Sequence, residues 1–258
     1  MNKTNDLKRK LQNGENVIGT WSSLSSANVV NVIGTTGLDF VVIDMEHGSM
    51  SFETVENMVR AAEVSGVSPI VRVWDDHEQT LLRALETGAR SVMIPHINSP
   101  EKAERVAKCC KYFPEGNRGL SPYTRVHDFT HENIAQSLQR ENLETFVGIL
   151  VEGSEGLDNL EEIVKIEGID LIYLGLFDIC QSVGLPGQLN HPKVLDEIRR
   201  CKEVIQSNGI AAGSMSTDIE FVKMLRNLDY KFIAYLNDAA ALKNFFLNAL
   251  DELDVKKG

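Results

Sequence analysis

Several features that mark whole classes of protein are missing from these 258 residues. There are only four cysteines, Cys109 and Cys110 are adjacent, and no CxxC spacing occurs. This excludes a disulfide framework and favours reduced, intracellular thiols. No apolar run approaches the roughly 18 residues that a membrane-spanning helix needs. The polar N-terminal segment MNKTNDLKRKLQNGEN lacks the apolar stretch of a secretory signal, so we expect a cytoplasmic protein with no membrane partner.

Positive charge is also scarce. Lysine and arginine total 26 against 37 aspartates and glutamates, a formal net charge of −11. An acidic surface repels phosphate backbones, so nucleic acid is not an expected partner. Hydrophobic residues make up 43% and charged residues 24%, which is typical of a folded chain rather than a disordered one. No linker rich in Pro, Gly or Ser divides the chain, which predicts one domain over residues 1–258.

What the chain has instead is a repeating pattern of a short apolar run, a turn and an amphipathic stretch. Eight apolar runs are expected as strands, at 16–21, 40–45, 68–73, 91–96, 146–151, 171–176, 209–214 and 231–236. The amphipathic stretches are expected as helices, at 25–34, 51–66, 78–88, 99–113, 154–166, 191–209, 217–228 and 238–253. Ser99 followed by Pro100 is a typical helix start, and the N-terminal segment is expected to form a short extra helix.

Eight strands that alternate with eight helices predict an α/β fold, a (β/α)8 TIM barrel. A doubly wound open sheet is the main alternative. The complete count of strands and the absence of GxGxxG after the first strand favour the barrel. The segment from about Pro114 to Glu144 is expected to be a long functional or mobile loop.

A barrel carries its active site at the carboxyl ends of its strands, and polar residues do gather there. They are Asp44, Glu46, His47, Arg72, His96, Glu152 and Asp178. Glu152 and Asp178 follow neighbouring strands, and two carboxylates without a Cys or His partner suit Mg2+ or Mn2+. Each acid alone is more simply a helix cap or the partner of an arginine, but the pair at this placement favours a metal site.

His47 and Arg72 are the candidate catalytic side chains near these acids. An imidazole titrates near neutral pH, so His47 suits a general base. A buried Arg72 needs a partner, which makes it a structural ion pair with Asp44 or Glu46, a cation for a carboxylate or oxyanion, or both. His96 either lines the pocket or packs. His77, His127 and His131 are expected in solvated loops or turns.

Three kinds of site are missing. No lysine ends a predicted strand, which excludes a Schiff-base aldolase. The turns after strands seven and eight, SMST and NDAA, have no Gly-rich phosphate cradle. No GxSxG, HExxH or P-loop motif occurs.

Taken in order, the segments VVIDMEHG, VRV, ALETGA, YFPEGNRGLSP, VEG, GLFD and VGLPGQLNHP resemble the HpcH/HpaI aldolase family. Members are class II, metal-dependent aldolases that handle pyruvate. The resemblance extends from Gly19 to about Asp238. It implies a (β/α)8 barrel whose last helix is exchanged between subunits of a homo-oligomer, commonly a trimer of dimers.

The resemblance also implies roles for single residues. Glu152 and Asp178 would bind Mg2+ or Mn2+, which pyruvate chelates through its ketone and carboxylate oxygens. His47, with a bound water, matches the base, and Arg72 matches the arginine that steadies the enolate. Glu86 falls where the family has an aspartate that supports the histidine, often from a neighbouring subunit. The backbone at Gly175, Leu176 and Phe177 falls where the family binds the carboxylate of pyruvate.

The sequence departs from the family at the pocket. The family loop Gly-Pro-Ala-Asp-Leu-Ser is Gly-Leu-Phe-Asp-Ile-Cys here, which places Phe177 in the loop and Cys180 in the expected pocket wall. A common glutamine two residues before the metal glutamate is Leu150. Phe177 and Leu150 make the site smaller and less polar, which leaves open a changed reaction or a lower activity.

The leading hypothesis is reversible cleavage of a 4-hydroxy-2-oxo acid to pyruvate and an aldehyde. The same enolate also serves an acyl-CoA ester lyase or an oxaloacetate decarboxylase, and Arg118 and Arg125 are the candidates for a basic rim that binds CoA. A non-catalytic protein that binds 2-oxo acids is the third alternative.

Overall fold

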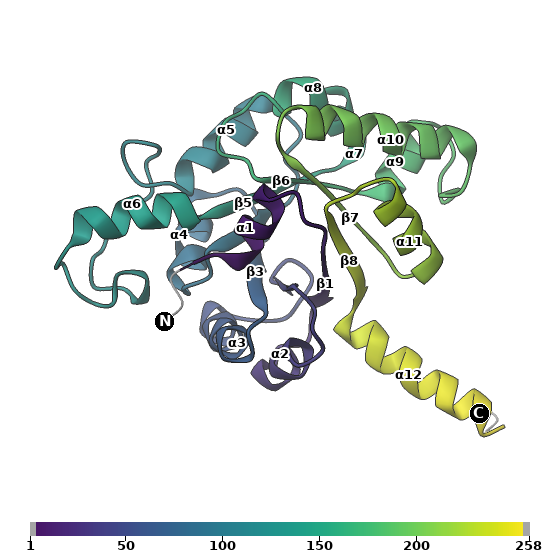
Figure 1. Ribbon diagram of the computed structural model, residues 1–258, viewed down its shortest axis with the longest axis horizontal. Helices are drawn as coiled ribbons and strands as arrows, with labels where there is room; N and C mark the ends of the chain where they lie inside the picture. Colours follow the sequence, from purple (N-terminus) through teal and green to yellow (C-terminus); the bar gives the residue numbers. More distant parts are fainter. Residues whose placement is uncertain (1–3, 255–258) are drawn as a thin grey trace.

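The structure, a computed structural model that describes residues 4–254, contains eight parallel strands that close into a barrel in chain order (Figure 1). The strands are β1 Val17–Ser22, β2 Phe40–Asp44, β3 Ser68–Arg72, β4 Ser91–Ile94, β5 Phe146–Val151, β6 Leu171–Leu174, β7 Ala211–Ser216 and β8 Phe232–Asn237. β8 pairs with β1 to close the sheet, with a shift of register between Gly19 and Trp21. The predicted TIM barrel is confirmed, and every strand lies within two residues of its predicted start.

Helices surround the barrel. They are α1 Asp6–Gln12, α2 Ala27–Gly34, α3 Phe52–Ser65, α4 Glu78–Glu86, α5 Pro100–Cys109, α6 Ile134–Glu144, α7 Gly153–Asp158, α8 Leu160–Ile163, α9 Leu176–Ser182, α10 Pro192–Ser207, α11 Ile219–Asn227 and α12 Asp238–Glu252. The predicted start of α5 is confirmed, because the Ser99 side chain accepts a hydrogen bond from the Lys102 N–H and Pro100 is the first helical residue. None of the helices in the described part of the chain is long and apolar enough to cross a membrane.

The expectation of one long loop from Pro114 to Glu144 was wrong. The segment contains a 3-10 turn, Arg125–His127, and the helix α6. α6 is attached by buried polar contacts rather than by an apolar stripe: Glu141 pairs with Arg90 at 3.0 Å, and Asn142 accepts a hydrogen bond from the backbone N–H of Tyr112. A pattern search that relies on apolar periodicity therefore has little signal here.

His127, in the same segment, is buried rather than solvated as expected. Its Nε2 lies 3.0 Å from the Tyr112 hydroxyl, and its Nδ1 lies 2.8 Å from the Ser137 hydroxyl. Burial lowers the pKa of His127, which favours the neutral ring. The ring therefore ties α6 to the rest of the chain.

The interior of the barrel is filled from its N-terminal end. Phe40 and Phe232 stack with ring centres 3.9 Å apart, and a side chain at Gly19 would collide with Phe40. Leu7 of α1 is 1% exposed and belongs to this interior cluster, and Asn5 hydrogen-bonds Ser91 at the start of β4. α1 thus closes the N-terminal end of the barrel and leaves room for a cavity only at the opposite end.

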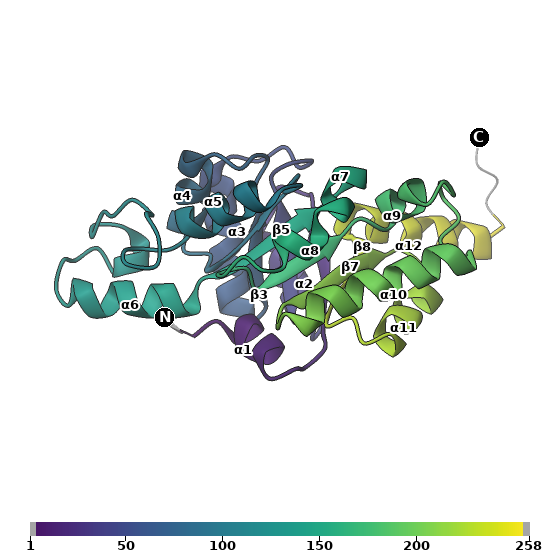
Figure 2. The same ribbon diagram turned by 90° about the horizontal axis from the view of Figure 1, so that it is seen from above.

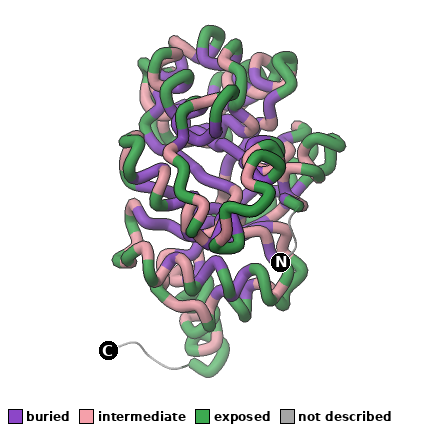
Figure 3. The backbone as a smooth tube through the Cα atoms, turned by 90° about the vertical axis from the view of Figure 1, so that its left-hand side faces the viewer, coloured by how far each residue is buried: buried purple, intermediate pink, exposed green. Residues whose placement is uncertain are grey.

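The last helix, α12, leaves the body of the barrel, at the opposite end of the molecule from α6 (Figures 1 and 2). Asp238 is its only buried residue among those described, and Figure 3 shows the exposed tube toward the C-terminus. Its uncovered apolar side chains are Leu242, Phe245, Phe246 and Leu250, and Leu253 directly after the helix is exposed as well. Exchange of this helix between subunits needs such an uncovered face, and the exchange itself stays a prediction.

The role of α1 can be tested by truncating its buried side chain. We expect Leu7→Ala to lower the free energy of unfolding by about 2–5 kcal/mol, because the cavity left behind cannot collapse against the barrel. Urea denaturation measures the change. The exposed Gln12→Ala on the same helix is the matched control, with an expected change within about 0.5 kcal/mol. Equal stability of the two variants would contradict a closing role for α1.

Candidate active site

A cavity of about 490 Å3 opens at the carboxyl ends of the strands. Its wall includes seven of the eight residues predicted for the site: His47, Arg72, Glu152, Gly175, Leu176, Phe177 and Asp178. Seven of the eight strands or their following turns contribute to the lining, which explains why residues so distant in sequence meet. The predicted clustering of polar residues at this end of the barrel is therefore observed.

Arg72, the last residue of β3, carries the central positive charge. Its Nε and Nη2 donate to the two carboxylate oxygens of Asp44 at 2.9 and 2.6 Å, and its Nη1 lies 2.8 Å from Glu46. The guanidinium also stacks 4.4 Å from the centre of the Trp21 ring. Asp44 and Arg72 are register partners on β2 and β3, so the bidentate pair follows directly from strand pairing. Both predicted ion pairs are present, and they fix the guanidinium in one orientation.

Asp44 also shapes the turn that carries His47. Its Oδ1 accepts hydrogen bonds from the backbone N–H groups of Glu46 and His47, at 3.1 and 3.2 Å. The side chain of His47 is exposed at the rim of the cavity. One carboxylate therefore positions both candidate catalytic residues, the arginine through its side chain and the histidine through its backbone.

Glu152 lies at the start of α7 but does not cap it, because its side chain makes no capping hydrogen bond. Its buried Oε2 lies 2.8 Å from His96 Nδ1, without the geometry of a hydrogen bond, and has no hydrogen-bond partner among the described residues. Burial raises the pKa of Glu152, His96 opposes the rise, and the charges of Glu46 and Asp178 add to it. Among the described residues, the His96 ring is the charged partner within ion-pair distance of this oxygen, and it is a cation only when it is protonated.

Asp178 does not follow strand β6 directly, because the helix α9 begins at Leu176 and places it in the first turn. Its carboxylate folds back over Gly175, where any side chain would collide with it. Asp178 and Glu152 line the same cavity, and the charge of Asp178 contributes to the raised pKa of Glu152. The sequence missed α9 because its seven residues are too short for a clear helical period.

The residues present fit a hard divalent cation. The buried, unpartnered oxygen of Glu152 and the nearby carboxylate of Asp178 are the oxygen donors that Mg2+ and Mn2+ prefer. Between residues 4 and 254, no cluster of three or more His, Cys, Asp or Glu side chains is arranged to hold a metal ion. The protein would thus supply two ligands and leave the remaining positions to water and substrate.

His96 neither packs in the core nor lines the cavity. Its backbone takes the left-handed conformation, with a φ of 58°, and its ring is 67% exposed. The two ring nitrogens lie 3.2 Å from Glu46 and 2.8 Å from Glu152. His96 therefore bridges two acids of the site. Only the tertiary arrangement reveals this contact, since the three residues follow different strands.

Trp21 and Tyr173 are residues of the site that the sequence analysis missed. Both are 5% exposed, their rings meet edge to face with centres 5.7 Å apart, and both line the cavity. Neither the Trp21 Nε1 nor the Tyr173 hydroxyl has a hydrogen-bond partner among the described residues. Burial raises the pKa of Tyr173, so the hydroxyl stays protonated. The side chains of a strand alternate between its two faces, and Trp21 on β1 and Tyr173 on β6 point into the barrel. This alternation is the sequence signal that could have identified them.

Glu86, at the end of α4, lines a separate cavity of about 340 Å3 with Phe52 and Phe129 and not the cavity that His47 lines, so its expected support of a histidine from a neighbouring subunit stays a prediction. Three residues lie elsewhere than expected. Cys180 is fully buried but does not line the active-site cavity, contrary to expectation. Arg118 and Arg125 are buried and do not form a basic rim: Arg118 stacks on Tyr112, and Arg125 pairs with Glu63.

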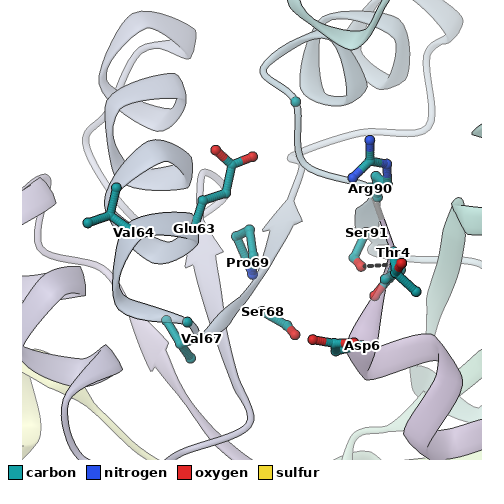
Figure 4. A pocket seen from close by; sticks show the side chains of 12 residues that line it. Thr4, Asp6, Glu63, Val64, Val67, Ser68, Pro69, Arg90 and Ser91 are labelled. Carbon is teal, nitrogen blue, oxygen red and sulfur yellow. Dashed lines mark hydrogen bonds between the residues drawn. The ribbon is translucent and has the colours of Figure 1, made fainter. Parts of the chain in front are cut away.

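Another cavity, of about 320 Å3, lies at the opposite end of the barrel (Figure 4). Ser68 and Ser91 at the starts of β3 and β4 line it, together with Glu63 and Arg90. Its charged groups are engaged in ion pairs, Glu63 with Arg125 and Arg90 with Glu141. The N-terminal face of a barrel serves stability, so the candidate active site is the cavity at the carboxyl ends.

Comparisons with known proteins show which family and relatives this chain resembles. A family model described as HpcH/HpaI aldolase/citrate lyase matches residues 17–244. A hydroxypyruvate/pyruvate aldolase of Roseobacter denitrificans is 28% identical over 240 residues, 93% of each chain. A pyruvate aldolase of Rhizobium etli is 30% identical over 239 residues, 92% of this chain and 93% of that one.

Solved structures share the fold. A HpcH/HpaI aldolase/citrate lyase family protein from Burkholderia cenocepacia has a TM-score of 0.90 at 29% identity, covering 97% of this chain and all of that one. Protein CitE of Mycobacterium tuberculosis, solved in complex with magnesium and acetate, has a TM-score of 0.55 at 14% identity, over 89% of this chain and 88% of that one.

The central ion pair can be tested through stability. We expect Asp44→Ala to cost about 3–5 kcal/mol of unfolding free energy, because it leaves the buried Arg72 guanidinium with a single carboxylate. The matched control is Asp6→Ala, whose pair with Arg9 is exposed and contributes less than about 1 kcal/mol. Chemical denaturation measures both. A cost for Asp44→Ala as small as that of the control would contradict the central role of the pair.

Proposed function

This chain belongs to the HpcH/HpaI aldolase/citrate lyase family, and we propose that it reversibly cleaves a 4-hydroxy-2-oxo acid into pyruvate and an aldehyde. The main support is that four residues line one cavity at the carboxyl ends of the strands: His47, Arg72, Glu152 and Asp178. Relatives named as pyruvate aldolases over more than nine-tenths of this chain support the same reaction class.

Glu152 and Asp178 would hold the divalent ion, Mg2+ or Mn2+. When bound there, such an ion supplies Lewis-acid polarisation of the 2-oxo group. The magnesium bound by the Mycobacterium tuberculosis protein of the same fold is consistent with a hard cation. The unpartnered Glu152 oxygen supports the choice of this position on this chain's own geometry.

In the cleavage direction, His47 takes the proton of the 4-hydroxyl group. The C3–C4 bond then breaks, its electron pair forms the enolate of pyruvate, and the aldehyde leaves. Arg72 stabilises the enolate oxygen, and its bonds to Asp44 and Glu46 hold the guanidinium ready, so little reorganisation is needed. Protonation at C3 releases pyruvate.

Further roles follow from the family resemblance. The backbone at Gly175, Leu176 and Phe177, which lines the cavity, would bind the carboxylate of pyruvate. Glu86 would support His47 of a neighbouring subunit, which fits its distance from the cavity of its own chain. The uncovered apolar face of α12 supports a homo-oligomer with exchanged helices, proposed as a trimer of dimers. Arg118 and Arg125 do not line the cavity, so they do not form the basic rim that a CoA substrate would favour.

The proposed chemistry can be tested without knowledge of the aldehyde, by following deuterium exchange into the methyl group of pyruvate by NMR. We expect metal-stripped protein to be inactive, Mg2+ or Mn2+ to restore exchange, and His47→Ala to abolish it. His77→Ala, an exposed histidine at the start of α4, is the matched control and should exchange like the wild type. Folded protein that binds either ion but exchanges no deuterium would overturn the proposal.

Arg72 makes a separate prediction. We expect Arg72→Lys to slow deuterium exchange into pyruvate by about 100-fold or more. An ammonium group lacks the planar set of N–H donors with which a guanidinium can bond Asp44 and the enolate oxygen at the same time. Arg83→Lys, an exposed position on α4, controls for the general effect of the substitution. Folding of both variants is checked by circular dichroism. A rate for Arg72→Lys equal to that of Arg83→Lys would refute the oxyanion role.

A further inference from the structure

Apart from a few charged groups, the wall of the active-site cavity is mainly apolar, and we infer that the aldehyde partner is apolar, with an aliphatic or aromatic chain and no charged group. This inference rests on the proposed function. Pyruvate would use the backbone at Gly175, Leu176 and Phe177 and the side chains of Arg72, Glu152 and Asp178, and these three side chains account for the charged part of the wall other than Asp44 and His47. The remainder of the cavity is what the aldehyde portion of the substrate can occupy.

That remainder is mainly hydrocarbon. It is lined by Leu150, Leu176, Phe177, Leu189 and Met215, which come from β5, α9, the segment after α9 and β7. Leu150 and Leu176 are buried, while Leu189 and Met215 are half-buried. Burying apolar surface is worth about 25 cal/mol per Å2, so these side chains favour an apolar ligand.

Among these residues, Phe177 gives the strongest support for an apolar ligand. Its side chain is 69% exposed although it borders the cavity, so it offers an uncovered aromatic ring at the wall. It is not packed in the core of its own barrel, in contrast to its neighbours Leu176 and Ile179. A ligand whose chain lies against this ring would cover apolar surface that is otherwise exposed to water.

Most of the hydroxyl and amide groups at the Ser23, Ser216 and Asn237 part of the lining already make hydrogen bonds. Ser23 accepts a hydrogen bond from the Asn237 side-chain amide at 2.9 Å, and the Asn237 oxygen caps α12. Ser216 accepts from the backbone N–H of Asp218 at 3.0 Å. Among the described lining residues, the hydroxyls of Thr217 and Tyr173 and the Trp21 Nε1 have no side-chain hydrogen bond. The Trp21 and Tyr173 atoms are buried, so a polyhydroxylated aldehyde would find few accessible free partners here.

Charge argues against an anionic aldehyde. Arg72 is the only lysine or arginine among the lining residues, and Asp44 and Glu46 already hold it. Asp44, Glu152 and Asp178 make the wall acidic. A second carboxylate or a phosphate on the aldehyde would meet repulsion without a cation to offset it.

The reaction itself needs no further co-reactant. In the condensation direction, His47 takes a proton from the methyl group of pyruvate, and C3 of the resulting enolate forms a bond to the aldehyde carbon. The carbonyl electron pair moves onto the aldehyde oxygen, which takes the proton held by His47. The product is a 4-hydroxy-2-oxo acid with an apolar tail.

The test compares aldehydes of equal length but different polarity. Protein loaded with Mg2+ or Mn2+ is given pyruvate and either butanal, erythrose or 4-oxobutanoate, which are four-carbon apolar, hydroxylated and anionic aldehydes. We expect kcat/KM for butanal to exceed the other two by about tenfold or more, the discrimination that an apolar pocket can supply. Equal use of the three aldehydes, or a preference for either polar one, would overturn the inference.

Substitutions in the lining test whether the cavity wall causes the preference for an apolar aldehyde. Phe177→Ser and Leu189→Ser should each lower the ratio of butanal to erythrose turnover by about fivefold or more, because a polar side chain replaces part of the apolar wall. Leu143→Ser is the matched control: it removes an exposed leucine of α6, far from the lining, and should keep the wild-type ratio. An unchanged ratio in both cavity variants would refute the assigned wall.

Deuterium exchange into pyruvate, measured on the same preparation, distinguishes failure of the aldehyde inference from failure of the proposed function. Exchange without a butanal preference overturns the aldehyde inference and leaves the enolate chemistry standing. Absence of exchange in the folded, metal-loaded wild type overturns the proposed function, and the aldehyde inference falls with it.

Discussion

The buried ion pair between Arg72 and Asp44 is the interaction on which the rest of the site depends. Burying a guanidinium in the mouth of a barrel costs free energy unless its N–H groups are paired. Here Asp44 accepts from Nε and Nη2 of Arg72, and Glu46 pairs with Nη1. Strand register places the pair, since Asp44 and Arg72 are partners on β2 and β3. The same carboxylate holds the turn of His47 through backbone hydrogen bonds. Stability and chemistry therefore share one contact.

The barrel separates a packed end from an open one. Stacked phenylalanines and Leu7 of α1 fill the interior near the N-terminal ends of the strands, so the cavity can form only at the carboxyl ends. The wall of that cavity combines acidic residues and one arginine with hydrocarbon side chains that include Phe177 and Leu189. This combination suits a reaction that forms a charged enolate and releases a neutral fragment.

Sequence reasoning succeeded where structure follows local pattern. Parallel strands covered on both faces are continuous apolar runs, so all eight could be recognised without knowledge of their partners. It failed at α6, whose attachment depends on Glu141 and Asn142 rather than on an apolar stripe, and at α9, which is too short to show a period. It also placed Cys180 in the pocket wall and His127 in solvent, because burial of one residue is decided by elements distant in sequence.

The sequence by itself determined the barrel and the identity of the groups at its active end, because hydrophobic period and strand ends are local properties of the chain. Only the tertiary structure decided which of these groups touch. It joined Arg72 to both Asp44 and Glu46, set His96 between two acids, left the tips of Trp21 and Tyr173 unpartnered in the cavity wall, and kept Glu86 apart. Closure of the sheet brings β1, β6 and β8 together, and distances across a closed barrel depend on all strands at once.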